Sequence, residues 1–140
     1  MSETFDIALG LIKRHEGFRS KPYKCTAGKL TIGYGHNLDD VGITQAQAQM
    51  LLNDDVGNAA YFLEKNYSWF NALDTNRKAA LIDMCFQLGK LGYSKFIRMN
   101  QWLYAKNYDD AAIAALQSKW AEQTPERAAE IAKIIRTGNI

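Results

Sequence analysis

EGFRSKPYKCTAGKLTIGYGH, residues 16 to 36, is the stretch of the chain that decides its fold class. It follows residues 5–16, where apolar side chains recur at the three- or four-residue spacing of a helix. Glycines and one proline then divide short segments rich in Tyr, Thr, Leu and Ile, which is typical of small hairpin strands. We therefore expect a first helix capped by Thr4 and ending near Glu16, and a β-containing segment directly after it.

Beyond this stretch the chain shows helical patterns only. Thr44 predicts the start of a long helix, and further helices are expected near residues 74–88, 94–105, 108–116 and 124–136. Thr124 and Pro125 form a start signal for the last of these, with a capping hydroxyl and a proline at the first helical position. The prediction is a single α+β, mainly α domain over residues 1–140. It has a β-containing lobe at about residues 13–45, and a helical lobe at about residues 46–140 that includes the N-terminal helix and is reached through a long helix.

Composition excludes several classes of protein. The chain has 140 residues, 47% of them hydrophobic and 23% charged, which is ordinary for a globular domain. Its net charge of +2 is spread without basic blocks, so no nucleic-acid partner is expected. No run approaches the roughly 18 apolar residues of a membrane span, and the N-terminus lacks a cleavage pattern, so we expect neither an anchor nor a signal peptide. Cys25 and Cys85 form no disulfide framework, although one bridge between them stays open.

One group of residues can carry chemistry. Glu16 stands at a helix end and is followed at once by a glycine-rich hairpin that holds Cys25, Thr31 and His36. Glycosidic cleavage needs an acid that protonates the leaving oxygen and a second group that places a water or stabilises the developing cation. Glu16 could supply the acid, although a single acidic residue near a helix end is more often a solvated charge.

The pattern of residues 16–36 resembles the active-site segment of the phage-type (T-even-like) lysozymes and endolysins, a family of glycoside hydrolases. Their motif is a Glu, eight residues, an Asp or in some members a Cys, five residues and a Thr, and Glu16, Cys25 and Thr31 stand at these spacings. The similarity extends through residues 53–56, 77–81, 86–89 and 120–127 to residues 136–138. It implies a lysozyme-like fold. A shorter link between His36 and Thr44 departs from the larger relatives and is expected to trim a lobe helix.

The resemblance also implies roles for individual residues. Glu16 would be the general acid, and Thr31 would hold the attacking water in an inverting arrangement. Arg127 matches the family arginine that contacts the catalytic glutamate. His36 and Asp55 match positions that form a structural ion pair near the lobe junction.

Cys25 is the most informative position, because an Asp there would be anionic at neutral pH. A thiol of ordinary pKa, about 8.5, is only a few per cent ionised at that pH. Three roles stay open: a thiolate that activates the water, a thiol that orients it, or a nucleophile that forms a covalent glycosyl intermediate. We favour the first two, in line with the motif. Cys85, inside a helical run, is read as a buried core residue.

Two further residues match positions near the substrate cleft of the family. Phe86 could stack on a sugar face, although core packing is nearly as plausible for a phenylalanine at this helical spacing. Gln87 stands next to it. Trp69, Trp102 and Trp120 are assigned to the helical core first, because a helical domain needs aromatic core residues.

The expected function is a monomeric muramidase without metal or cofactor. It would cut the β-1,4 bond between N-acetylmuramic acid and N-acetylglucosamine in bacterial peptidoglycan during phage-induced lysis. We expect it to stay in the host cytoplasm until a holin lets it reach the wall. A catalytically weakened peptidoglycan-binding module is the alternative, and a lytic transglycosylase is disfavoured by Thr31 as a water holder.

Overall fold

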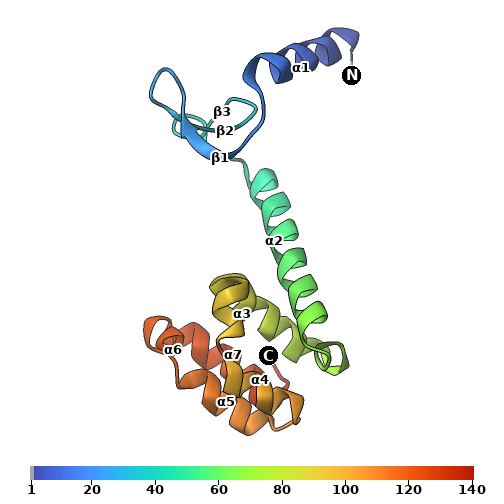
Figure 1. Ribbon diagram of the computed structural model, residues 1–140, viewed down its shortest axis with the longest axis vertical. Coiled ribbons are helices and arrows are strands. Elements are labelled where there is room, and N and C mark those ends of the chain that lie inside the picture. The colour runs from blue at the N-terminus through green and yellow to red at the C-terminus, as the bar shows by residue number, and fades with distance from the viewer. Residues whose placement is uncertain (1) are drawn as a thin grey trace. The chain divides into compact units, whose positions relative to one another are not determined.

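The computed structural model describes residues 2–140, which form two compact units (Figure 1). The first unit ends at Met50 and the second begins at Leu51, so the boundary lies inside helix α2, Gln45–Asn66. The strands belong to the first unit, and the second is helical. The mainly helical α+β class is therefore confirmed, whereas the predicted grouping of the N-terminal helix with the helical lobe stays a prediction.

Helix α1, Glu3–Glu16, begins two residues earlier than expected. The Ser2 hydroxyl accepts a hydrogen bond from the Phe5 N–H at 3.2 Å, so Ser2 is the cap and the prediction of Thr4 was wrong. Thr4 already lies within the first helical turn. At the other end Gly17 has φ of 68° and its N–H donates to the Lys13 carbonyl at 2.9 Å, which ends the helix directly after Glu16.

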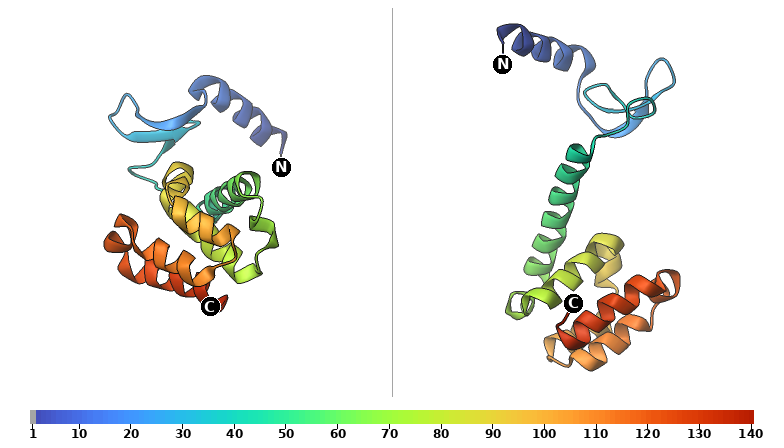
Figure 2. Two further views of the ribbon diagram at one scale, coloured as in Figure 1. Left: turned by 60° about the horizontal axis from the view of Figure 1, so that its bottom comes forward. Right: turned by 180° about the vertical axis from the view of Figure 1, so that it is seen from behind.

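The expected hairpin segment is confirmed as a three-stranded antiparallel sheet in the order β1-β2-β3 (Figure 2). Its strands are β1, Arg19–Lys24, β2, Leu30–Gly33, and β3, His36–Asn37. Thr31 in the central strand lies opposite Tyr23 on one side and Asn37 on the other. The sheet therefore places Thr31 between two strands, where its side chain is only 3% exposed.

The second unit contains the rest of α2, the short 3-10 helix η1, and the helices α3 to α7. Their bounds are η1, Phe70–Ala72, α3, Thr75–Ser94, α4, Ile97–Tyr104, α5, Tyr108–Leu116, α6, Lys119–Gln123, and α7, Pro125–Thr137. The sequence pattern missed α6. Helix α3 has a kink at Gly89, where φ is 76°, and helical residues resume after it, so α3 extends beyond the expected end at residue 88. Among residues 2–140, no helix combines the length and apolar character needed to cross a membrane.

Of the two predicted caps in this part of the chain, one is present. Thr44 accepts a hydrogen bond from the Gln47 N–H at 3.1 Å, and the Gln47 side chain accepts one from the Thr44 N–H at 2.8 Å, so α2 begins with a capping box. Thr124 makes no capping bond, because its hydroxyl donates to the Trp120 carbonyl at 2.9 Å. Pro125 alone marks the start of α7.

The core of the second unit joins all its longer helices. Helices α5 and α7 lie side by side, with buried alanines that allow close approach (Figure 2). The largest fully buried side chains are Tyr93, Phe70, Leu63, Leu81, Met84, Met99, Leu103, Ile135 and Cys85. Trp120 is buried as expected, but Trp102 is 36% exposed, so its assignment to the core was wrong.

Arg77 ties the start of α3 to the end of α7. Its Nε and Nη2 donate to the carbonyls of Ile135 and Arg136 at 2.6 and 3.0 Å, which are helix-end acceptors without partners inside α7. Its Nη1 also pairs with Asp74 at 3.0 Å, and its guanidinium lies 3.7 Å from the centre of the Tyr108 ring. One largely buried arginine thus holds three helices together.

Replacing Arg77 by Met should lower the free energy of unfolding by about 3 kcal/mol, because charge-assisted bonds to helix-end carbonyls are lost while the side-chain bulk is kept. Thermal and urea unfolding measure the change. Arg98→Met is the matched control, since Arg98 is exposed on α4 and its replacement should cost less than about 0.5 kcal/mol. Equal losses in the two variants would contradict this role of Arg77.

Candidate active site

Cys25 and Thr31 are brought together by one backbone carbonyl. The Lys29 oxygen accepts a hydrogen bond from the Cys25 N–H at 3.0 Å and another from the Thr31 hydroxyl at 2.8 Å. A tight turn closes this hairpin end, where the Gly28 N–H donates to the Cys25 carbonyl at 2.8 Å and Gly28 has φ of 76°. The sequence motif identified the two side chains, but Lys29 carried no signal because its contribution comes from the backbone.

The Cys25 sulfur accepts hydrogen bonds from neighbouring backbone N–H groups. Bonds from the backbone of Lys29, and then of Ala27, hold the pKa of the Cys25 thiol below its usual value. Partial desolvation acts in the opposite direction without reversing the shift. The site therefore favours an anion at this position, which is the electrostatic requirement that an Asp would also meet.

Glu16 lies against the turn that joins β2 to β3. A Cβ atom on Gly35 would come within 2.7 Å of both Cδ and Oε2 of Glu16, so the carboxyl group occupies the space that any other residue would fill. Gly35 also has φ of 72°, which suits glycine. The same strand that carries Thr31 leads into this turn, and the first unit therefore positions both residues. Gly35 was part of the recognised motif, but its contact with Glu16 was not predicted.

Tyr34 helps to fix this arrangement. Its ring centre lies 5.6 Å from that of Phe18, which follows the end of α1, and the Lys13 ammonium lies 5.5 Å above the ring. These contacts pack the last turn of α1 and the segment after it on the β2–β3 turn. Since Glu16 is the last residue of α1, they set the place of its carboxyl group.

His36 and Asp55 lie in different units, and the ion pair predicted between them stays a prediction. In the first unit, the Nε2 of His36 donates a hydrogen bond to the Gly42 carbonyl, which closes the link after β3. In the second unit, Asp55 borders a hollow on α2 and α3 together with Phe86 and Lys90.

Arg127 forms a partly exposed ion pair with Asp83, with 2.9 Å between Nε and Oδ1. The predicted contact between Arg127 and Glu16 stays a prediction. Asp83 was missed, because no local spacing connects two residues that are 44 positions apart. Phe86 lies in the same hollow as this pair and is 42% exposed. Core packing therefore does not account for the Phe86 ring.

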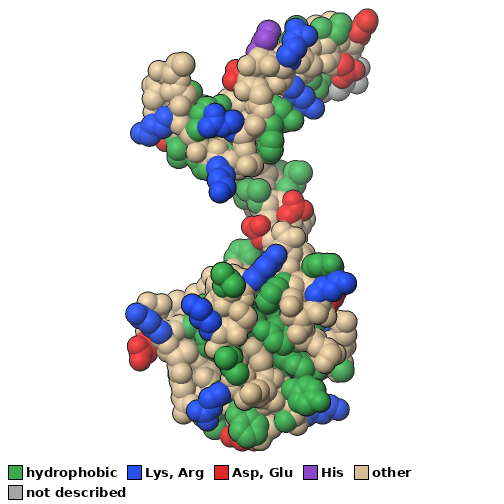
Figure 3. Space-filling view, in the orientation of Figure 1, with side chains coloured by type: hydrophobic (Ala, Val, Ile, Leu, Met, Phe, Trp, Pro, Cys, Tyr) green, Lys and Arg blue, Asp and Glu red, His purple; other side chains and the backbone are tan. Residues whose placement is uncertain are grey.

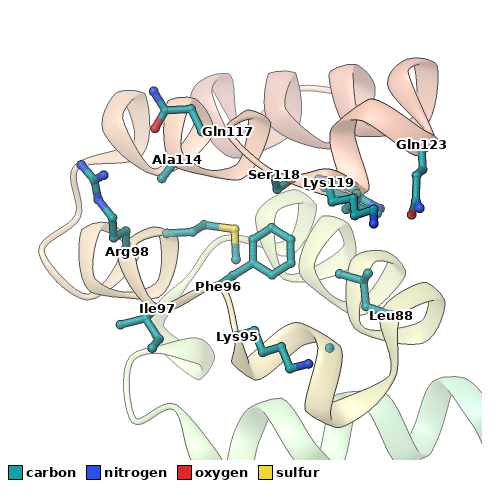
Figure 4. A pocket seen from close by; sticks show the side chains of 13 residues that line it. Leu88, Lys95, Phe96, Ile97, Arg98, Ala114, Gln117, Ser118, Lys119 and Gln123 are labelled. Carbon is teal, nitrogen blue, oxygen red and sulfur yellow. The ribbon is translucent and has the colours of Figure 1, made fainter.

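Gln87 contacts the wall of a second hollow through Trp120. Its Oε1 accepts a hydrogen bond from the Trp120 Nε1 at 2.8 Å, and Trp120 lines a hollow of about 470 Å³ within the second unit (Figure 4). The lining includes the Phe96 ring, which meets Trp120 edge to face at 5.9 Å. Three cationic side chains also line it: Lys95, Arg98 and Lys119. In the space-filling view, Lys and Arg side chains border apolar patches on this unit (Figure 3). The hollow suits an anionic ligand with apolar faces.

Cys85 lies in the core at 2% exposure, where burial raises the pKa of its thiol. Its assignment as a buried core residue is confirmed. Both cysteines are free thiols in this structure. Among residues 2–140, no group of three or more His, Cys, Asp and Glu side chains could hold a metal ion.

Comparisons with known proteins agree on one family. The family model described as phage lysozyme matches residues 13–133. A Dictyostelium discoideum protein, probable T4-type lysozyme 2, is 30% identical over 159 aligned residues that cover 93% of this chain and 94% of that protein. An endolysin of Acyrthosiphon pisum secondary endosymbiont phage 1 is 38% identical over 118 residues, covering 81% of this chain and 77% of that protein.

The two thiols should differ sharply in reactivity. The lowered pKa of Cys25 gives a larger thiolate share near neutral pH, whereas the raised pKa and the burial of Cys85 keep it protonated and covered. Iodoacetamide should therefore label Cys25 alone, and its rate should level off at a lower pH than that of free cysteine. Peptide mass spectrometry over a pH series measures this. Equal labelling of Cys85, or a profile like that of free cysteine, would contradict the described surroundings of Cys25.

Proposed function

The chain belongs to the phage lysozyme family, and from that premise we propose that it is a muramidase with Glu16 as its general acid. Membership of the family carries a lysozyme glycosidase activity on peptidoglycan. The proposal adds the bond, which is the β-1,4 linkage between N-acetylmuramic acid and N-acetylglucosamine. It also adds the setting, which is phage-induced lysis of the host cell.

The observation that carries the proposal is the hydrogen-bonded pair of Cys25 and Thr31 on the Lys29 carbonyl. An inverting hydrolase needs a base and a water on the face of the sugar opposite the acid. A thiolate at Cys25 can accept a proton from the water, and the Thr31 oxygen keeps a lone pair for the water's other hydrogen. The described backbone donors around the sulfur lower the pKa of the Cys25 thiol, which favours its anion.

The reaction then follows with its protons in balance. Glu16 donates its proton to the glycosidic oxygen as the bond to the muramic acid C1 breaks. The water attacks C1 from the other face while its proton passes to the Cys25 sulfur. Exchange with solvent returns the proton to Glu16 and removes it from the thiol, which restores the starting state.

The second unit offers features that suit the polymer. The cationic lining formed by Lys95, Arg98 and Lys119 fits an anionic wall strand, and the exposed Phe86 ring offers a face for a sugar. We propose that the protein acts as a monomer and needs no metal or cofactor. It would wait in the host cytoplasm until a holin opens the way to the wall.

Release of reducing ends from purified peptidoglycan tests the proposal. Glu16→Gln should lower the rate by about 10³-fold, because the amide cannot donate a proton to the leaving oxygen. Glu3→Gln is the matched control, since Glu3 lies in the first turn of the same helix and its replacement should leave the rate unchanged. Binding of the wall without release of reducing ends by the wild type would favour the binding-module alternative. An anhydro-muramic product would indicate a transglycosylase.

The same assay separates the roles of the two cysteines. Cys25→Ser should lower the rate at least about tenfold, because a serine hydroxyl does not ionise near neutral pH. Cys25→Asp should retain most of it. Cys85→Ser changes a core cysteine, so it should affect stability more than turnover. Full activity of Cys25→Ser would exclude the sulfur as the base.

The placement of Glu16 against Gly35 leads to a further test. Gly35→Ala should lower turnover about tenfold or more, because the new Cβ displaces the carboxyl group. Gly33→Ala is the matched control, since Gly33 also has a positive φ, 70°, but a Cβ there would meet no atom within 4 Å. Both variants should lose a similar amount of stability, which thermal unfolding measures. An equal fall in turnover would mean that backbone strain alone matters.

A further inference from the structure

The turn after β3 contacts Lys29 and Leu30, which lie between Cys25 and Thr31 in the β1–β2 hairpin. Asp39 accepts a hydrogen bond from the Leu30 N–H at 2.7 Å through its Oδ2. Its neighbour Asp40 pairs with the Lys29 ammonium at 3.1 Å. These two aspartates belong to the link between His36 and Thr44. This link therefore contacts the candidate site.

The contact of Asp39 falls on a particular peptide group. The Leu30 N–H and the Lys29 carbonyl belong to one peptide plane, with the carboxylate at its donor end. At its acceptor end lie the Cys25 N–H and the Thr31 hydroxyl, at 3.0 and 2.8 Å. A hydrogen bond to a carboxylate polarises a peptide, so the carbonyl oxygen at the other end becomes a stronger acceptor.

We propose that Asp39 is a positioning residue that acts through the Lys29–Leu30 peptide to hold the Thr31 hydroxyl. A threonine hydroxyl has one hydrogen, and it can donate either to the Lys29 carbonyl or to the Cys25 sulfur. A polarised carbonyl retains that hydrogen. The Thr31 lone pairs then stay available to the attacking water, and the sulfur stays free to take the water's proton. This inference rests on the proposed function of Cys25 and Thr31.

Asp40 provides the comparison that isolates this effect. Its carboxylate contacts the Lys29 ammonium and the Asn37 side chain. Its N–H donates to the Asn37 Oδ1 at 3.0 Å, so Asp40 does not contact the Lys29–Leu30 peptide group. Its contacts stabilise the turn and pair with an exposed lysine. Removing Asp40 therefore loosens the same turn without removing the carboxylate from the polarised peptide.

The first measurement compares kcat and KM of Asp39→Asn, Asp39→Ala and Asp40→Ala. Asp39→Ala should lower kcat about tenfold with KM within about twofold, because the water loses its orientation while the sugar contacts remain. Asp39→Asn keeps an acceptor oxygen and should lie between Asp39→Ala and the wild type. Asp40→Ala should stay close to the wild type. A fall in kcat as large in Asp40→Ala as in Asp39→Ala would overturn the proposal, because the turn would then act only as a structural support.

The second measurement needs no turnover. Three-bond NMR couplings to the Thr31 methyl carbon report its χ1 angle, which should be a single rotamer in the wild type and in Asp40→Ala. In Asp39→Ala the couplings should become rotamer-averaged. Unchanged couplings would overturn the proposal. An inactive wild type would contradict the proposed function, whereas the couplings would still decide whether Asp39 holds the Thr31 side chain.

Discussion

The Lys29 carbonyl is the point on which the candidate site depends. It accepts the Cys25 N–H, a bond that ties the end of β1 to the start of β2, and it also accepts the Thr31 hydroxyl, which holds that side chain against its own strand. A typical hydrogen bond contributes a net stabilisation of about 1 kcal/mol. Loss of this carbonyl would cost more than that, because it would leave buried donors without an acceptor. The tight turn at Gly28 and the Asp39 contact both serve to keep this oxygen in place.

The backbone around Cys25 explains how the thiol at this position can favour its anion. Backbone donors at Lys29 and Ala27 converge on the side chain of this position and stabilise whichever anion it holds. The backbone of the turn thus stabilises the negative charge, and the side chain supplies the atom that bears it. Cys85 shows the contrast, because a thiol placed among apolar side chains has its pKa raised.

Patterns of residues predicted the elements well where the physical cause is local. The helical spacing of residues 5–16 and the glycine punctuation of residues 16–36 correctly predicted α1 and a segment of hairpin strands after it. Local reasoning failed where a choice depended on partners, as when the Thr124 hydroxyl turned to the Trp120 carbonyl, or where Ser2 preceded the expected cap. Within the site, motif spacing identified side chains but not the backbone of Lys29, the contact of Gly35 or the ion pair of Asp83, since these arise only when distant segments meet.

The anomeric form of the first product tests the central claim most directly. Proton NMR of peptidoglycan fragments, recorded before mutarotation, shows whether the new reducing end is α or β. If Cys25 and Thr31 direct a water against the β-linked sugar while Glu16 protonates the leaving oxygen, the first product is the α anomer. A β anomer would contradict this account, because retention requires that Cys25 or another group first form a covalent bond to the sugar.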